Sequence, residues 1–368
     1  MKLGKAIGFL SLMSLVACGG ASKSPIFGKA GSNGPAAEEV ILNVVPLMDL
    51  THNMKFEALP LEGSVDISKR LWSGDHWPSN RGGLNRRWNA PPEEPGFNTL
   101  SPTREELTLM TPEDIARLSP SEKWDLLLGQ YDYPFKKEVA LYTNPVAISW
   151  EGIGNGWASA SINHDEPTPR VLTNADGIVI PFGSSDIKAL LSYYYAFSKK
   201  LPITQNLGLR CPVTPDGSKP DEFCTNDLNA GSFHIAIGNK LGLQKQAIVG
   251  DIDRYSEVWN QPFIAYKSQV LETLDPVEGT LKGTVKILRM KTKIYYAGLA
   301  EGNSWDPIIG TFRNVTTNRI YNYDLFINAA GEIHGGAWIS GDRPDFIWVM
   351  PRVETFEDNF AALAQLLN

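Results

Sequence analysis

Cysteine is scarce in this 368-residue chain, which has only three, Cys18, Cys211 and Cys224. Cys211 and Cys224 flank a loop rich in proline, aspartate and glycine, and we predict that they form a disulfide in a chain exported from the cytoplasm. Closing a loop of this size would contribute about 3 kcal/mol. The alternative is a reactive or metal-binding pair, but there is no second cysteine pair and no nearby histidine cluster. Because Cys18 lies in a lipidation signal, no free thiol remains for chemistry.

Positively charged residues are also fewer than negatively charged ones, with 34 Lys and Arg against 41 Asp and Glu. The net charge of −7 and the pI near 5.4 argue against nucleic acid as a partner and against basic tethering to anionic lipid. Beyond the N-terminus no apolar run is long enough to predict a transmembrane helix. The composition, 42% hydrophobic and 20% charged, is that of a soluble protein with a large core.

The N-terminus has the pattern of a bacterial lipoprotein signal. Lys2 and Lys5 precede a short apolar run that ends in Leu-Val-Ala and then Cys18. This ending resembles a lipobox, so we predict a signal peptide over 1–18, a diacylated Cys18 and a flexible tether over 19–39. The alternative is an ordinary signal peptide with an incidental cysteine. The prediction places the protein in the bacterial cell envelope, anchored to a membrane by lipid, with its oligomeric state left open.

The remaining chain, residues 40–368, is predicted to form one domain of α+β class, with helices first and an antiparallel sheet second. Thr111 and Ser119 are each followed by proline and acidic residues, which is how helices start. Residues 71–88 are rich in tryptophan but lack a period, and we predict an extended segment that packs its tryptophans on the core. Further helices are predicted from Asn155 and from Ser184, and strands over 233–237, 247–252, 263–270, 285–288, 291–296, 321–328 and 332–339.

A histidine and a carboxylate occupy the ends of two of these apolar segments. His234 follows a Gly-Ser turn and precedes Ile-Ala-Ile, and Asp251 closes the next apolar run. We predict neighbouring antiparallel strands on which the carboxylate orients the imidazole as a general base, as papain-like acyl-transfer sites require. Asp253, which shares the strand parity of Asp251, is the alternative partner.

The segment that should supply the nucleophile does not contain one. Between Trp150 and Trp157 the chain reads Glu-Gly-Ile-Gly-Asn-Gly, and a helix of small residues is predicted to follow. A helix N-terminus lowers the pKa of a thiol and offers backbone N–H donors to an oxyanion. Gly154 occupies the position where we place the nucleophile. Ser159 and Ser161 lie further along the helix and would point elsewhere.

His164, Asp165 and Glu166 form a triplet that could belong to a metal site. An isolated triplet of this kind is more typical of a solvated helix end, and that is our prediction. The sequence predicts no metal site and no cofactor.

These motifs together resemble the transglutaminase-elicitor family, which comprises oomycete cell-wall transglutaminases and bacterial secreted homologues. The most specific match is Glu257-Val-Trp-Asn-Gln-Pro262, which resembles the family's elicitor segment. The resemblance extends roughly from Trp72 to Trp348. Its other motifs are Trp72-Ser-Gly with Trp77-Pro78, Leu118 to Leu128, Asp227 to His234, Ser304 to Pro307, and Gly335 to Trp338 with Ser340 to Trp348.

The resemblance implies a papain-like, transglutaminase-like core in which a cysteine thiolate attacks a glutamine carboxamide and an amine takes the acyl group. It implies that His234 is the general base, that Asp251 orients it and that the nucleophile belongs at Gly154. Trp150 and Trp157 bracket that position, and Trp259 and Asn260 belong to the elicitor segment, so these four are the predicted binding residues.

Three functions remain open from the sequence. The first is a transglutaminase-like protein whose acyl-transfer chemistry is impaired and whose cleft binds a protein or peptide. The second is an active acyltransferase with an unrecognised nucleophile. The third is a structural or envelope-binding lipoprotein without enzymatic activity.

Overall fold

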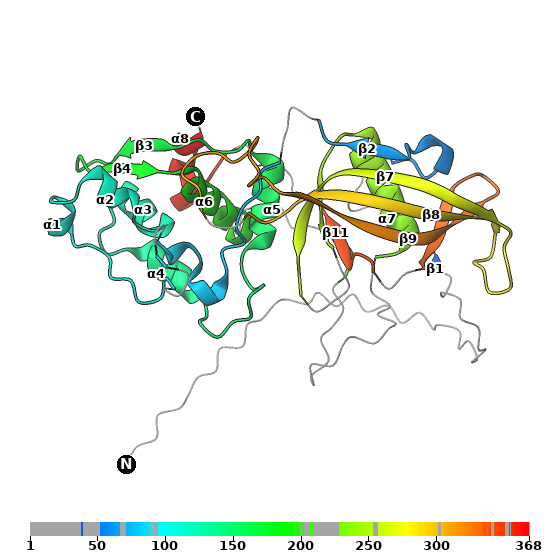
Figure 1. Ribbon diagram of the computed structural model, residues 1–368, viewed down its shortest axis with the longest axis horizontal. Helices are drawn as coiled ribbons and strands as arrows, with labels where there is room; N and C mark the ends of the chain where they lie inside the picture. Colours follow the sequence, from blue (N-terminus) through cyan, green and yellow to red (C-terminus); the bar gives the residue numbers. More distant parts are fainter. Residues whose placement is uncertain are drawn as a thin grey trace, which may run out of the picture. The chain divides into compact units, whose positions relative to one another are not determined.

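The computed structural model describes residues 38–39, 52–66, 71–87, 90–91, 95–198, 201, 206–209, 228–252, 257–300, 303–339, 342–349, 353 and 355–367 (Figure 1). All of them belong to a compact unit that spans Pro35–Asn368. The predictions for Cys18, residues 19–37 of the tether, Asp253 and the disulfide between Cys211 and Cys224 fall outside the described residues. The last two residues predicted as tether, Glu38 and Glu39, instead pair with Gly335 and Gly336 in the sheet.

Helices dominate the first half of the described chain, as predicted. They are α1 (Arg104–Leu107), α2 (Pro112–Ala116), α3 (Pro120–Leu127), α4 (Pro134–Leu141), α5 (Gly154–Asn163) and α6 (Ser184–Phe197), with short 3₁₀ turns η2 (Phe56–Ala58), η3 (Ser79–Arg81) and η4 (Gly83–Asn85) and a hairpin of β3 (Arg170–Thr173) and β4 (Val179–Phe182). The starts predicted at Thr111 and Ser119 are confirmed, because each side chain accepts a hydrogen bond from the backbone N–H three residues later.

Buried ion pairs connect the helices to one another. Lys123 of α3 donates to Asp186 of α6 at 2.6 Å, and both side chains are fully buried. Lys188 of α6 forms a second buried pair with Glu166, which also accepts from the backbone N–H groups of Ile308 and Ile309. The prediction of a solvated helix end is therefore wrong for Glu166, because distant backbone donors satisfy its carboxylate inside the protein.

A large antiparallel sheet forms the second half, and the α+β class is confirmed. Its strand order is β1-β10-β9-β8-β7-β6-β11-β5, with β2 also paired to β7 (Figure 1). The bounds are β1 (Glu38–Glu39), β2 (Glu62–Ser64), β5 (Leu207–Gly208), β6 (Ile248–Asp251), β7 (Asn260–Leu274), β8 (Thr284–Ala297), β9 (Thr316–Asn328), β10 (Ile333–Trp338) and β11 (Phe346–Trp348). The strands predicted over 285–288 and 291–296 are one continuous strand, β8.

The strand predicted over 233–237 is wrong, because this segment is the helix α7 (Ala230–Ile237), which continues into the π-helical turn η5 (Gly238–Leu243). The side chain of Asn229 caps α7 by accepting from the N–H groups of Gly231 and Ser232. Every residue of α7 is buried. A short apolar run that is buried all round has no period that separates strand from helix. The helix packs on β9 and β10.

The two described tryptophans of the extended segment pack into the core, as predicted. Trp72 is fully buried and Trp77 is 5% exposed. At the C-terminus η6 (Asp358–Leu363) and α8 (Ala364–Leu367) return to the helices, where Phe360 stacks on Trp124. Within the described residues no helix is both long and apolar enough to cross a membrane.

Candidate active site

The site begins at the N-terminus of α5, where the sequence places the nucleophile. The helix starts at Gly154, and no side chain caps its first turn. Trp157 is fully buried and directs its indole N–H toward the backbone carbonyl of Trp72 at 3.4 Å. The predicted helix start is therefore confirmed. Trp157 fixes α5 against the core. Because its side chain is fully buried, it has no surface with which to contact a ligand, although it was among the predicted binding residues.

His76 lies against Gly154. Its carbonyl accepts a hydrogen bond from the N–H of Ile153 at 2.8 Å, which joins the extended segment to the start of α5. A Cβ atom built on Gly154 would lie 3.7 Å from the Cβ of His76, and outside its own turn of helix no other atom of the described residues would lie within 4 Å. Gly152 is different, because a Cβ there would lie 2.3 Å from the His76 carbonyl oxygen. The structure thus has room for a side chain at position 154 but not at position 152.

The imidazole of His76 is held between two acceptors. Nε2 lies 2.9 Å from the carbonyl oxygen of Ser149, and Nδ1 lies 3.3 Å from Oδ1 of Asp75. Burial by itself would lower the pKa of His76, but the hydrogen bonds to Asp75 and Ser149 outweigh burial and raise it above 6.5. Since both ring nitrogens face acceptors, the geometry favours the imidazolium. These hydrogen bonds therefore favour protonation of the ring that lies beside the position expected for the nucleophile.

Asp251 reaches the same region through the elicitor-like segment. The ring of Trp259 meets the ring of His76 edge-on, with centroids 5.8 Å apart. The backbone N–H of Trp259 donates to Oδ1 of Asp251 at 2.9 Å. Asp251 is fully buried at the end of β6 and pairs in register with Asn260, whose side-chain oxygen accepts from Trp348. Asp251 and the elicitor-like segment are thus bonded to each other, and Trp259 of this segment packs on His76, which lies beside the start of α5.

His234 does not join this group, and its predicted pairing with Asp251 is not formed. Its Nδ1 lies 2.7 Å from the hydroxyl of Tyr323, and its Nε2 has no hydrogen-bond partner among the described residues. The ring is fully buried and stacks on Phe56. Burial lowers the pKa of His234 to about 4, so the ring is neutral at physiological pH. The physical reason is that α7, rather than a strand, carries the residue and turns it toward β9.

The serines of α5 cannot replace the missing nucleophile. Ser159 donates to the carbonyl of Asn155 and Ser161 to that of Trp72, and both side chains are buried. Their hydroxyls are therefore directed into the helix and the core, as the sequence predicts.

His164 bonds to the hydroxyl of Tyr195, and no cluster of three metal-binding side chains occurs in the part of the chain that the structure describes.

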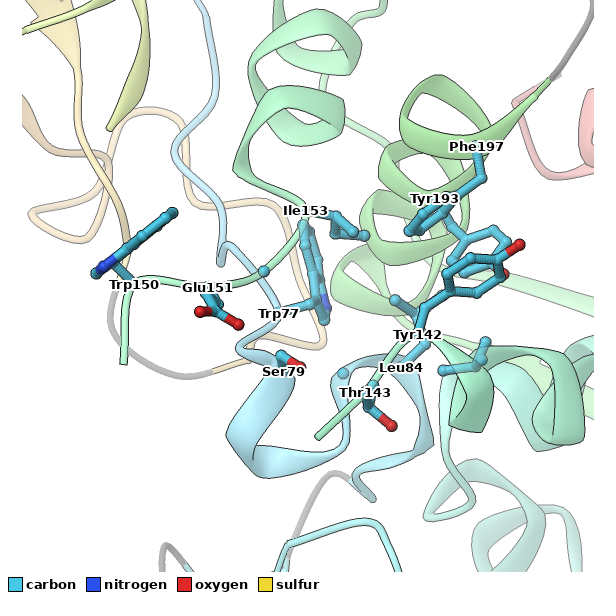
Figure 2. A pocket seen from close by; sticks show the side chains of 13 residues that line it. Trp77, Ser79, Leu84, Tyr142, Thr143, Trp150, Glu151, Ile153, Tyr193 and Phe197 are labelled. Atoms are coloured by element: carbon cyan, nitrogen blue, oxygen red, sulfur yellow. The ribbon is translucent and has the colours of Figure 1, made fainter. Parts of the chain in front are cut away.

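A pocket is lined in part by residues 150–153, which lead into α5 (Figure 2). Its volume is about 240 Å³. Trp77 forms one wall, and Tyr142, Tyr193 and Phe197 form the wall across from it (Figure 2). We call this pocket the aromatic slot. Its remaining lining residues are Ser79, Gly83, Leu84, Val139, Thr143, Trp150, Glu151, Gly152 and Ile153.

Sequence reasoning missed His76 and the aromatic slot. The histidine lies inside the tryptophan-rich signature, but the segment has neither helical nor strand period that would mark the direction of its side chain. Its key partner, Ser149, is 73 positions away. The only available signal was the combination of a histidine with tryptophans and glycines in a segment that had to be extended and buried.

Comparison with solved structures defines the class of the fold. The crystal structure of the GP42 transglutaminase from Phytophthora sojae is similar to this chain with a TM-score of 0.61 and 22% sequence identity. The similarity covers 86% of this chain and 93% of that chain. The fold is therefore that of a transglutaminase-like protein.

The family follows from the sequence. The Transglutaminase elicitor family model matches residues 140–358, which is more than half of the chain. The protein belongs to this family, and the resemblance identified from its motifs is confirmed. A search of curated proteins found no match.

Proposed function

We propose that this protein is a lipid-anchored, transglutaminase-like protein of the bacterial cell envelope that has lost acyl transfer and keeps a binding site for a protein or peptide. One observation carries the proposal: α5 begins at Gly154, at the position where the family chemistry needs a thiol. Acyl transfer requires a thiolate that attacks the carboxamide carbon, expels ammonia and then passes the acyl group to an amine. Glycine has no atom that can form the thioester.

The surroundings of Gly154 support a retained site. His76 lies beside Gly154, the indole of Trp259 packs on His76, and the carboxylate of Asp251 accepts from the backbone N–H of Trp259. Trp150 and Trp259 are partly exposed, so they can contact a ligand. In this proposal the backbone N–H groups in the first turn of α5 offer hydrogen bonds to the backbone or carboxamide of a bound peptide, without covalent chemistry.

The envelope location rests on the sequence. The apolar run that ends in Leu-Val-Ala before Cys18 supports a lipid anchor, and the pairing of Cys211 with Cys224 fits an oxidising compartment. Both remain part of the proposal, and mass spectrometry of the protein from membranes tests both: it should find a diacylated Cys18 and a Cys211–Cys224 disulfide.

An amine-incorporation assay tests the loss of chemistry. The purified protein should transfer no fluorescent primary amine to a glutamine-containing peptide above the level of a His76→Ala variant, because neither protein has a nucleophile at position 154. Ammonia release, measured in parallel, should also stay at background. Sustained turnover by the wild-type protein that His76→Ala abolishes would refute the proposal.

A further inference from the structure

We propose that the aromatic slot is a binding site for a monocation with a flat apolar body, such as an aryl-alkyl ammonium, including fully N-methylated forms. This site lies beside the start of α5 and does not use the acyl-transfer chemistry. Three features of the slot lead to this assignment. Its walls are aromatic, Glu151 is its one charged lining residue, and the hydrogen bonds of Glu151 within the described residues are those of its backbone.

The walls suit a flat apolar group. Trp77 and Tyr193 line the slot but are only 5% and 2% exposed, so each presents no more than an edge to it, whereas Tyr142 is 54% exposed and Phe197 is half-buried. Tyr142 and Phe197 pack with ring centroids 4.4 Å apart, and Phe197 packs on Tyr193 at 4.7 Å. Leu84, Val139 and Ile153 complete an apolar lining. A ligand of phenyl size would pack its body on the accessible rings of Tyr142 and Phe197, with the edge of Trp77 across from them.

The charge of the lining selects a cation. Of the 13 lining residues, Glu151 is the one that is charged, and none is lysine, arginine or histidine. The hydrogen bonds of Glu151 within the described residues are made by its backbone, which accepts from Ser79 at 2.7 Å and donates to Ile148 at 3.1 Å. The half-buried carboxylate is therefore free to pair with a ligand. A second carboxylate, Glu138, accepts from the hydroxyl of Tyr193 behind the wall.

Aromatic faces and a carboxylate together are the means by which proteins recognise ammonium groups. The ring faces attract the cation through their quadrupoles, and Glu151 adds a direct charge interaction that the partly buried position protects from screening. An anion would meet an uncompensated carboxylate, and a neutral ligand would gain only the contact with the walls. Because ring faces attract N-methyl groups as well as N–H groups, a quaternary ammonium should bind as well as a primary one.

A ligand-observed NMR titration of the full chain tests the assignment with four probes of one shape. We expect phenethyltrimethylammonium and phenethylammonium to bind at least about fivefold more tightly than phenethyl alcohol. We expect no saturable binding of 3-phenylpropionate. If the alcohol or the propionate binds as tightly as the two cations, or if the primary ammonium alone binds, the assignment is wrong.

Matched variants locate the site. Glu151→Gln should reduce the affinity for both cations toward that for the alcohol, whereas Glu105→Gln, which removes an exposed carboxylate from α1, should change nothing. Tyr142→Ala should weaken binding of cations and alcohol alike, whereas removal of the exposed ring in Phe312→Ala should not. Unchanged cation affinity in a folded Glu151→Gln protein, judged by its melting temperature, would overturn the proposal.

Discussion

A Gly154→Cys variant should acquire a thiol that is deprotonated at mildly acidic pH. The new side chain would stand at the N-terminus of α5, with its Cβ about 3.7 Å from that of His76, so the helix dipole and the imidazolium both favour the thiolate. We expect a pKa of about 6 in place of the usual 8.5. The larger thiolate fraction outweighs the lower intrinsic nucleophilicity, and iodoacetamide at pH 6 should react roughly tenfold faster than with an ordinary thiol.

The control for this prediction is Ala140→Cys, which places a thiol on an exposed position of α4. Peptide mapping by mass spectrometry separates both new thiols from the three native cysteines. Adding His76→Ala to Gly154→Cys should return the pKa toward 8.5, whereas adding His234→Gln should leave it depressed. An ordinary pKa in the folded single variant, or dependence on His234 in place of His76, would mean that the site is misplaced.

Removal of His234 should change how stability depends on pH. The pKa of His234 is about 4 in the folded protein and 6.5 in the unfolded chain, because burial disfavours the charged ring. Between these values the unfolded chain binds a proton that the folded protein excludes. The stability from the neutral ring is therefore complete above pH 6.5 and is lost as the pH falls toward 4. Over this range the loss should reach about 3 kcal/mol.

Urea denaturation at several pH values measures this effect as a difference between wild type and His234→Gln. Glutamine keeps a polar group for Tyr323 but does not titrate, so the variant should lose less stability than wild type between pH 6.5 and 4. His76→Gln is a control of opposite sign. The raised pKa of His76 means that its contribution is complete below pH 6.5 and is lost as the pH rises through the folded value. A constant difference between wild type and His234→Gln would contradict the buried, neutral ring.

The sequence predicted those parts of the fold that depend on local signals. Thr111 and Ser119 specify their helices because a cap and an acidic residue three positions later act within one turn. The middle of β7 follows from alternation, since buried and exposed side chains alternate over residues 266–269, whereas β9 is buried on both faces over residues 323–327. The helix α7 was missed because all its residues are buried, and burial on every side erases the period.

The residues of the candidate site were also predicted only where a local signal marks them. The start of α5 was predicted because it is a local feature, marked by glycines before a run of small residues. The assignment of Gly154 to the nucleophile position stays a prediction. The place of His76 was not predicted, because a sequence does not contain the packing that brings this residue from the extended segment to Ser149 and Trp259. His234 looked more suitable because its segment had a pattern, yet its contacts with Phe56 and Tyr323 make it a core residue.

Labelling with a glutamine-mimicking electrophile tests most directly whether the chain lacks a nucleophile. A peptide that carries 6-diazo-5-oxonorleucine in place of glutamine should alkylate any thiol or hydroxyl that the site activates, and intact-protein mass spectrometry reads the result. We predict no adduct on the wild-type protein and one adduct on Gly154→Cys, located by peptide mapping at the introduced thiol. A stoichiometric adduct on a native side chain of the wild-type protein would contradict the account and would identify the nucleophile of an active acyltransferase.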